Sequence, residues 1–215
     1  MHAYIREPFN SLSHLMGAFL GLAGLIILLK KGLEIDSSPL TLSAIVIFGV
    51  SMILLYTASA TYHWLIGKVQ HIQFLRRLDH SMIYILITGT YAPFCLITLN
   101  NTAGYVLFTI ILVLAASGIL FKMIWFNSPR WVSTAIYIGM GWMIIFLAPT
   151  LADSLGSTGL VYLILGGISY TIGGIIYGLK PNISFIKKLG FHEIFHLFIL
   201  VGTLCHFICV YVYVL

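Results

Sequence analysis

Long apolar runs separated by short polar breaks dominate the hydrophobic pattern of the chain. A membrane-spanning helix needs about 20 consecutive, mainly apolar residues. On that rule the sequence predicts seven spans, at about 12–33, 42–66, 79–99, 104–125, 132–150, 159–178 and 192–214. The breaks carry turn-forming chemistry, as in "LEIDSSP", "GKVQHIQFLRR", "LNNTAG", "FNSPR", "ADSLGSTG" and "KPNISFIKK". Because no connection is long enough to form a soluble domain, we expect a single seven-helix bundle over residues 1–215.

Composition supports the membrane assignment. Hydrophobic residues make up 60% of the chain, charged residues make up 8%, and the mean hydropathy is +1.04. Soluble domains carry about 25% charged residues, so this chain lacks the charge to cover a soluble surface, and we expect an all-α integral membrane protein. The first residues, "MHAYIREPFNSLSH", are polar and have no small-residue cleavage site. We therefore expect no removable signal peptide.

Basic residues are distributed unequally between the two sides of the predicted bundle. The side with the N-terminus and the loops after spans two, four and six carries nine: Arg6, Lys68, Arg76, Arg77, Lys122, Arg130, Lys180, Lys187 and Lys188. The other side carries Lys30 and Lys31. Basic loops face the cytoplasm, so we expect a cytoplasmic N-terminus and an outside C-terminus, opposite to G-protein-coupled receptors. This topology explains the net charge of +5 without nucleic-acid binding.

Polar and ionisable side chains from four spans fall at one membrane level, near the cytoplasmic ends. They are His63 ending the second span, Asp79 opening the third, His192 and His196 opening the seventh, and Glu7, Asn10 and His14 at the start of the first. Ionisable residues in spans are costly and usually face the bundle interior. We therefore expect a functional site at that level.

Zinc suits this set, because it binds neutral imidazole nitrogens and three protein ligands leave a fourth position for water. His192 and His196, at i and i+4, share one helix face, and His63 can supply a third ligand. Ser59, four residues before His63 in "SATYH", shares the face of His63. It can hydrogen-bond a water, a substrate or a metal ligand. Asp79 can act as a general base toward zinc-bound water.

Less specific explanations stay open for each residue. Two of eight histidines can fall four apart by accident. His63 alone fits an interfacial histidine, and Ser59 alone fits a hydroxyl bonded to its own helix backbone. Asp79 can instead pair with Arg76 or cap its span. The letters "HEIFH" also match the H-E-x-x-H zinc helix of metalloproteases, in which Glu193 would be the base.

The remaining histidines are expected away from the metal. His206 follows His196 by ten residues, or about 15 Å along a helix. It cannot share the same ion, so we expect a polar residue in the bundle interior. His2, His71 and His80 are expected in loops or at the interface.

A family resemblance is carried by "REPFNSLSH", "SATYH", "RRLDHS", "GTYAPF", "GGISYTIGGIIYGLK" and "HEIFHLFILVGTLCH". Together they resemble the bacterial hemolysin III proteins, the prokaryotic branch of the progestin and adipoQ receptor family. The resemblance covers nearly the whole chain in order. It implies a seven-helix bundle in the bacterial plasma membrane with a cytoplasmic N-terminus. It also implies zinc held by His63, His192 and His196, with Asp79 acting through the bound water and Ser59 as the serine of the motif.

What the resemblance implies about activity leaves three functions open. The wider superfamily includes alkaline ceramidases, so the leading prediction is a zinc-dependent hydrolase of membrane lipid amides or esters, with Asp79 and Ser59 as catalytic residues. The alternatives are a non-enzymatic regulator of membrane lipid or energetics homeostasis with structural zinc, and a cytolysin. Asp79 is preferred to Glu193 as the base, because Glu193 lies about 100° from His192 on an ideal helix. The residues expected around the ligands are Glu7, Asn10, His14 and Glu193.

Overall fold

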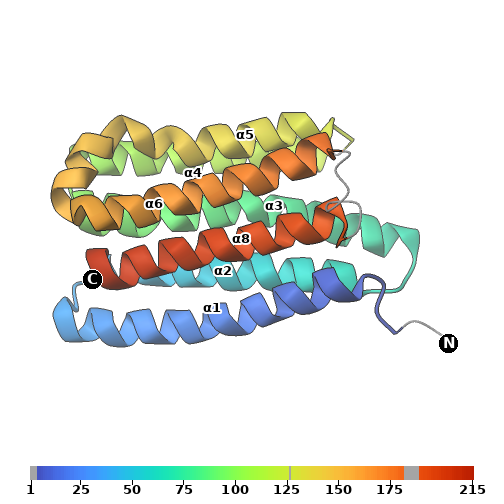
Figure 1. The fold of residues 1–215 in the computed structure, drawn as a ribbon, viewed down its shortest axis with the longest axis horizontal. Coiled ribbons are helices and arrows are strands. Elements are labelled where there is room, and N and C mark those ends of the chain that lie inside the picture. The colour runs from blue at the N-terminus through green and yellow to red at the C-terminus, as the bar shows by residue number, and fades with distance from the viewer. Residues whose placement is uncertain (1–3, 126, 182–188) are drawn as a thin grey trace.

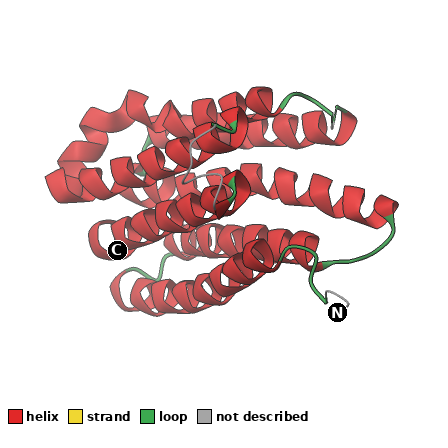
Figure 2. Ribbon diagram, turned by 45° about the vertical axis from the view of Figure 1, so that its right-hand side comes forward, coloured by secondary structure: helices red, strands yellow, loops and turns green. Residues whose placement is uncertain are grey.

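The structure is a computed structural model that describes residues 4–125, 127–181 and 189–215, and within these ranges every regular element is a helix (Figure 2). The α-helices are α1 (Pro8–Ile35), α2 (Pro39–Trp64), α3 (Val69–Pro93), α4 (Thr102–Ile124), α5 (Arg130–Trp142), α6 (Ala148–Leu179) and α8 (Phe191–Cys209). Short helical turns continue three of them: η1 (Phe94–Leu99), η2 (Met143–Leu147) and η3 (Val210–Val214). His2, Lys187 and Lys188 lie outside the described residues.

The helices run along the long axis of the molecule, and the two termini lie at opposite ends (Figure 1). Six helical segments of the described chain are long and apolar enough to cross a membrane. Five are α1, α2, α3 with η1, α4, and α8 with η3; the sixth is the continuous stretch Arg130–Leu179. The backbone of this stretch breaks at Gly156, where φ is 67°. Its two arms, α5 and most of α6, lie side by side in opposite directions (Figure 1), and Trp142 Nε1 donates to Thr171 Oγ1 across them at 2.9 Å.

Helix α3 begins well before its predicted start. It begins at Val69 rather than Asp79, because "VQHIQFLRR" contains no proline or glycine and is rich in residues that tolerate a helix. The interpretation of this segment as a loop was wrong, and Asp79 lies inside the helix. The segment "ADSLGSTG", expected as a break, is also helical apart from Gly156.

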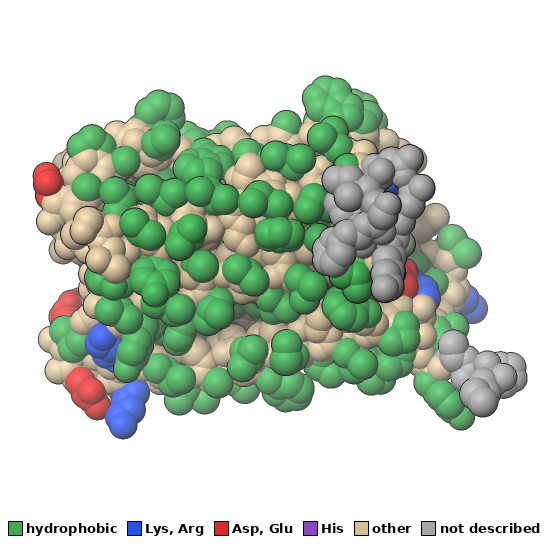
Figure 3. Space-filling model, in the orientation of Figure 1, with side chains coloured by type: hydrophobic (Ala, Val, Ile, Leu, Met, Phe, Trp, Pro, Cys, Tyr) green, Lys and Arg blue, Asp and Glu red, His purple; other side chains and the backbone are tan. Residues whose placement is uncertain are grey.

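The sides of the bundle are apolar. Large hydrophobic side chains that are about half exposed or more include Phe19, Ile26, Val106, Val113 and Leu120. On the face drawn in Figure 3, hydrophobic side chains cover the length of the bundle and the charged ones gather toward its two ends. Soluble monomers rarely expose apolar surface this extensive. The surface and the six apolar helices together indicate a multi-pass membrane protein.

Glycines allow close helix contacts inside the bundle. A Cβ at Gly118 of α4 would lie 2.2 Å from Tyr84 Cε1 of α3, and a Cβ at Gly166 of α6 would lie 2.3 Å from the His206 ring of α8. Small residues at such contacts are typical of membrane helix packing. His206 is buried there, with Nε2 3.1 Å from the Leu163 carbonyl oxygen. Its prediction as a polar residue of the bundle interior is confirmed.

Candidate metal centre

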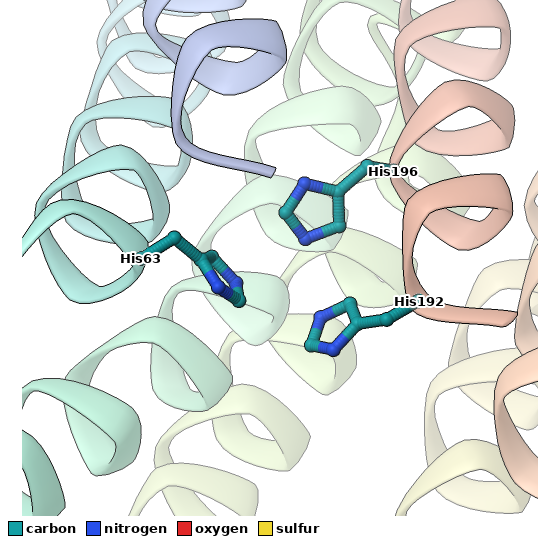
Figure 4. A group of neighbouring side chains, drawn as sticks. All are labelled: His63, His192 and His196. Atoms are coloured by element: carbon teal, nitrogen blue, oxygen red, sulfur yellow. The ribbon is translucent and has the colours of Figure 1, made fainter. Parts of the chain in front are cut away.

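Three imidazole rings face one another where α2 ends and α8 begins (Figure 4). His63 lies in the last turn of α2, while His192 and His196 lie one turn apart at the start of α8. The ring centroids are 4.8–4.9 Å apart in all three pairs. One ring nitrogen of each residue can be chosen so that all three lie within 4.8 Å of one another. His63 and His196 are buried and His192 is partly buried.

Two nitrogens of this cluster have no partner in the described structure. His63 Nε2 and His196 Nδ1 are buried, and no hydrogen-bonding atom of the described residues reaches them. Buried polar atoms are normally paired. Three imidazoles on one zinc ion place their ligand nitrogens about 3.3 Å apart, given zinc–nitrogen distances near 2.0–2.1 Å. The residues fit zinc, because three imidazole nitrogens within 4.8 Å of one another lie near that spacing and two buried nitrogens of the cluster lack a partner among the described residues.

Glu7 fixes the orientation of His63. The chain before α1 crosses the end of α2, where the Glu7 N–H donates to the His63 carbonyl oxygen at 3.0 Å. Glu7 Oε2 lies 2.5 Å from His63 Nδ1, which leaves Nε2 for the centre of the cluster. Partial burial raises the pKa of the Glu7 carboxyl, but His63, Asn10 and Arg6 together lower the pKa below its ordinary value. An ionised carboxylate on the far nitrogen of a histidine is typical of metal ligands.

Asn10 and His14, one and two turns into α1, lie behind the cluster. Asn10 Nδ2 donates to Glu7 Oε2 at 3.3 Å. The His14 ring stacks on the His196 ring, with centroids 3.6 Å apart and planes 13° apart. Both nitrogens of His14 are buried without a partner among the described residues. The structure therefore adds a fourth imidazole beside the three that share a centre.

Asp79 and Ser59 lie at the same end of the bundle. Both side chains are buried, and both line a cavity that His192 and His196 also line. Ser59 Oγ is buried and has no hydrogen-bond partner among the described residues. Asp79 is not one of the three side chains that converge as ligands. It lines the cavity beside the three histidines instead of joining their group.

Glu193 is not part of the group of three histidines, and its carboxylate lies beside Gly190 at the start of α8. Gly190, which precedes α8, has a φ of 96°, a conformation that favours glycine. The Glu193 carboxylate folds back over it, so that a Cβ at Gly190 would lie 1.9 Å from Glu193 Oε2. A carboxylate in the first turn of a helix interacts favourably with the helix dipole. Glu193 thus contributes to the start of α8.

The cavity beside the histidines has a volume of about 250 Å³. Its polar end contains Ser59, Asp79, His192 and His196. The rest is lined mainly by apolar side chains of α3, η1, α5, α6 and α8, including Ile87, Phe94, Leu151, Leu163 and Ile199. It also reaches Ile145 of η2 and Ile164 of α6, which are 55% and 39% exposed. The cavity therefore extends from the polar site to an apolar side of the bundle.

Several lining residues were missed in the sequence. Lys122, Ser128, Arg130 and Tyr177 line the polar end; only the charge of Lys122 within the apolar run "ILFKMIW" gave a usable signal. His80, which was expected in a loop or at the interface, is not in a loop. It lies inside α3 and lines the cavity, with Nε2 3.5 Å from Tyr177 Oη.

Comparisons with known proteins agree on one family. A family model described as "Haemolysin-III related" matches residues 2–207. The chain is 40% identical to "Hemolysin-3" of Bacillus cereus over 221 residues, covering 100% of this chain and 95% of the relative. It is 38% identical to the "Hemolysin-3 homolog" of Bacillus subtilis (strain 168) over 208 residues, covering 96% and 93%. It is 26% identical to "Monocyte to macrophage differentiation factor" of Homo sapiens over 173 residues, covering 78% and 68%.

Proposed function

Because the chain belongs to the haemolysin-III-related family of membrane proteins, we propose that it is a zinc-dependent hydrolase of membrane lipid amides or esters. We further propose seven crossings of the bacterial plasma membrane, with the N-terminus in the cytoplasm. The opposite positions of the two termini in Figure 1 support an odd number of crossings. The antiparallel arms α5 and α6 supply two of the seven, and the nine-to-two distribution of basic residues supports the orientation.

One observation carries the hydrolase proposal. A cluster of three imidazoles, with two buried nitrogens that lack partners in the described structure, adjoins a buried carboxylate and a buried hydroxyl. All of them stand at the polar end of a mainly apolar cavity. This arrangement suits a lipid whose reacting carbonyl lies at the polar end and whose acyl chain fills the remainder. The exposed side chains at Ile145 and Ile164 mark a path from the bilayer.

In this proposal His63, His192 and His196 hold zinc, and Glu7 keeps the His63 ring in position. When bound, zinc supplies Lewis acidity that polarises the substrate carbonyl and activates water. The Asp79 carboxylate accepts a proton from the attacking water and returns it to the leaving amine or alcohol. The Ser59 hydroxyl donates a hydrogen bond to the carbonyl oxygen as negative charge develops there.

The test measures fatty-acid release by purified, zinc-loaded protein from ceramides, lysophospholipids and monoacylglycerols. Asp79→Asn is expected to keep zinc and lose at least about 100-fold in rate, the usual loss for a general base. Asp153→Asn, an exposed residue of α6 that does not line the cavity, is the matched control and should match the wild type. Absence of activity on every lipid class would remove the hydrolase proposal.

A second candidate function is structural. His63 and His196 are almost completely buried, so a zinc ion there would tie the end of α2 to the start of α8. If the protein is a regulator of membrane state, His63→Ala should lower the unfolding temperature. The wild type should then hydrolyse no lipid. Structural sites are closed by four protein ligands, so a water ligand seen by X-ray absorption on the zinc-loaded protein argues against this role.

Cytolysis is a third candidate, because two relatives carry the name hemolysin. Adding purified protein to intact vesicles distinguishes a cytolysin from a protein that merely disturbs the membrane when overexpressed. Release of an entrapped dye after external addition supports a cytolysin. Lysis that occurs only when cells overexpress the protein indicates a general disturbance of the membrane.

A further inference from the structure

A cluster of cations lines the polar end of the cavity, on the side of the α4–α5 connection. Arg76 of α3, Lys122 of α4 and Arg130 of α5 all contribute to the lining. Asp79 is the only carboxylate that the described part of the chain contributes to the same lining. Three cations and one carboxylate leave an excess of two positive charges in the cavity wall.

Lys122 is the most deeply buried of the cations, with 2% of its surface exposed. Its Nζ donates to Ser128 Oγ at 3.1 Å, and Ser128 Oγ lies 3.5 Å from Ser133 Oγ. Within the described residues no carboxylate lies within ion-pair distance of Lys122. A buried charge is costly unless it is paired. The described residues around Lys122 supply hydroxyls but no carboxylate at ion-pair distance.

Arg130 connects these residues to the histidine cluster. Its Nη1 is buried and has no hydrogen-bond partner within the described ranges. Its guanidinium lies over the Tyr177 ring, 5.3 Å from the centroid, and the Tyr177 ring lies 5.5 Å from the His192 ring. Ser133 follows Arg130 by one turn of α5, on the same helix face. An anion held between Lys122 and Arg130 would therefore share the polar end of the cavity with the histidines, separated from His192 by the Tyr177 ring.

We propose that Lys122, Arg130, Ser128 and Ser133 form a binding site for the phosphate monoester headgroup of a single-chain lipid. A phosphate monoester carries a charge of about −1.5 to −2 and three acceptor oxygens, which matches the two excess positive charges and the hydroxyl donors. Lysine and arginine are the usual phosphate-binding side chains. The acyl chain then occupies the apolar length of the cavity. The inference deepens the proposed function by naming the headgroup, but it concerns binding and does not require turnover.

The test is equilibrium binding of three probes to the purified full-length protein in a neutral detergent. The probes are 1-oleoyl lysophosphatidate, 1-oleoylglycerol with the same chain and no charge, and inorganic phosphate. We expect the charged lipid to bind at least about tenfold more tightly than the neutral one, since one charge-assisted contact of about 1.4 kcal/mol has that effect. Inorganic phosphate should compete, with much lower affinity than the lipid.

Substitutions that each remove one positive charge test the site, and one of them serves as the control. Lys122→Met and Arg130→Gln should each weaken lysophosphatidate binding about tenfold, while Arg130→Lys should recover part of the loss. Lys68→Met removes an exposed cation outside the cavity and should bind as the wild type does. If Lys122→Met does not fold, the two variants of the partly buried Arg130 still test whether the cations bind the headgroup.

Three results would overturn this site. They are equal affinity for the two lipids, a loss of lysophosphatidate affinity in Lys68→Met as large as in the cavity variants, and binding of inorganic phosphate as tight as that of the lipid. The last result would identify free phosphate as the occupant. The proposed hydrolase can fail separately. Lysophosphatidate that binds as described and is never cleaved, in a protein inactive on every lipid class, removes the hydrolase and leaves the headgroup site.

Discussion

The contact between Glu7 and His63 allows a quantitative test of the metal centre. Glu7 Oε2 lies 2.5 Å from His63 Nδ1, and the His63 side chain is fully buried. The carboxylate orients the ring and raises the basicity of Nε2, the nitrogen left for the metal. Removing such a partner typically weakens metal binding 10- to 100-fold, or about 1.4 to 2.7 kcal/mol.

Two substitutions separate charge from geometry. Glu7→Gln keeps an oxygen that can accept from Nδ1–H but loses the charge, so the zinc dissociation constant should rise about tenfold. Glu7→Ala loses both and should raise it about 100-fold. Glu34→Gln changes an exposed glutamate at the other end of α1 and should leave zinc affinity unchanged.

Zinc affinity is measured by competition with a chromophoric chelator on purified protein at pH 7, with circular dichroism to verify helix content. A loss of zinc affinity in Glu7→Gln, and a larger loss in Glu7→Ala, would support the described role of the contact. Zinc affinity of Glu7→Ala within about twofold of wild type would refute it, since the expected loss is at least tenfold.

Three further outcomes follow from the packing, the loop charges and the metal. Gly118→Ala should destabilise the bundle by about 1–3 kcal/mol, because its Cβ would lie 2.2 Å from the Tyr84 ring, whereas Gly139→Ala, with nothing within 4 Å, should be neutral in the same thermal unfolding assay. Hydrogen bonds, led by that from Thr41, lower the pKa of Asp36. Its stabilising effect is therefore full above the unfolded pKa near 3.9 and is lost as pH falls through the lower folded value. Asp36→Asn should unfold below the wild-type temperature at pH 7, and a gap that does not narrow as the pH falls below the unfolded pKa would contradict this. Chelation should lower the unfolding temperature of the zinc-loaded protein, and re-addition of zinc should restore it; an unchanged temperature would argue against a bound ion.

The helical architecture was predictable because apolar runs of membrane length have few alternatives. Helix ends were less predictable. Residues 69–78 are less apolar than a membrane span but are helical, because they contain no proline or glycine and hydropathy records burial in lipid rather than backbone conformation. His80, expected in a loop or at the interface, lies inside the same helix.

The candidate site was only partly accessible from the sequence. The spacing of His192 and His196 places them on one face of a helix, and the order of the spans brings His63 to the same end. The stacking of His14 on His196 depends on how α1 packs against α8, which no local pattern specifies. The cations around Lys122 come from three separate helices, so their meeting in one cavity is a result of tertiary packing.

Metal content tests the central claim most directly. Protein purified in neutral detergent without chelators is assayed for zinc by mass spectrometry, alongside His192→Ala and His71→Ala, the latter an exposed histidine outside the cluster. The account predicts about one zinc per chain in the wild type and in His71→Ala, and a large loss in His192→Ala. A wild type that holds no zinc, even after zinc is supplied, would contradict it.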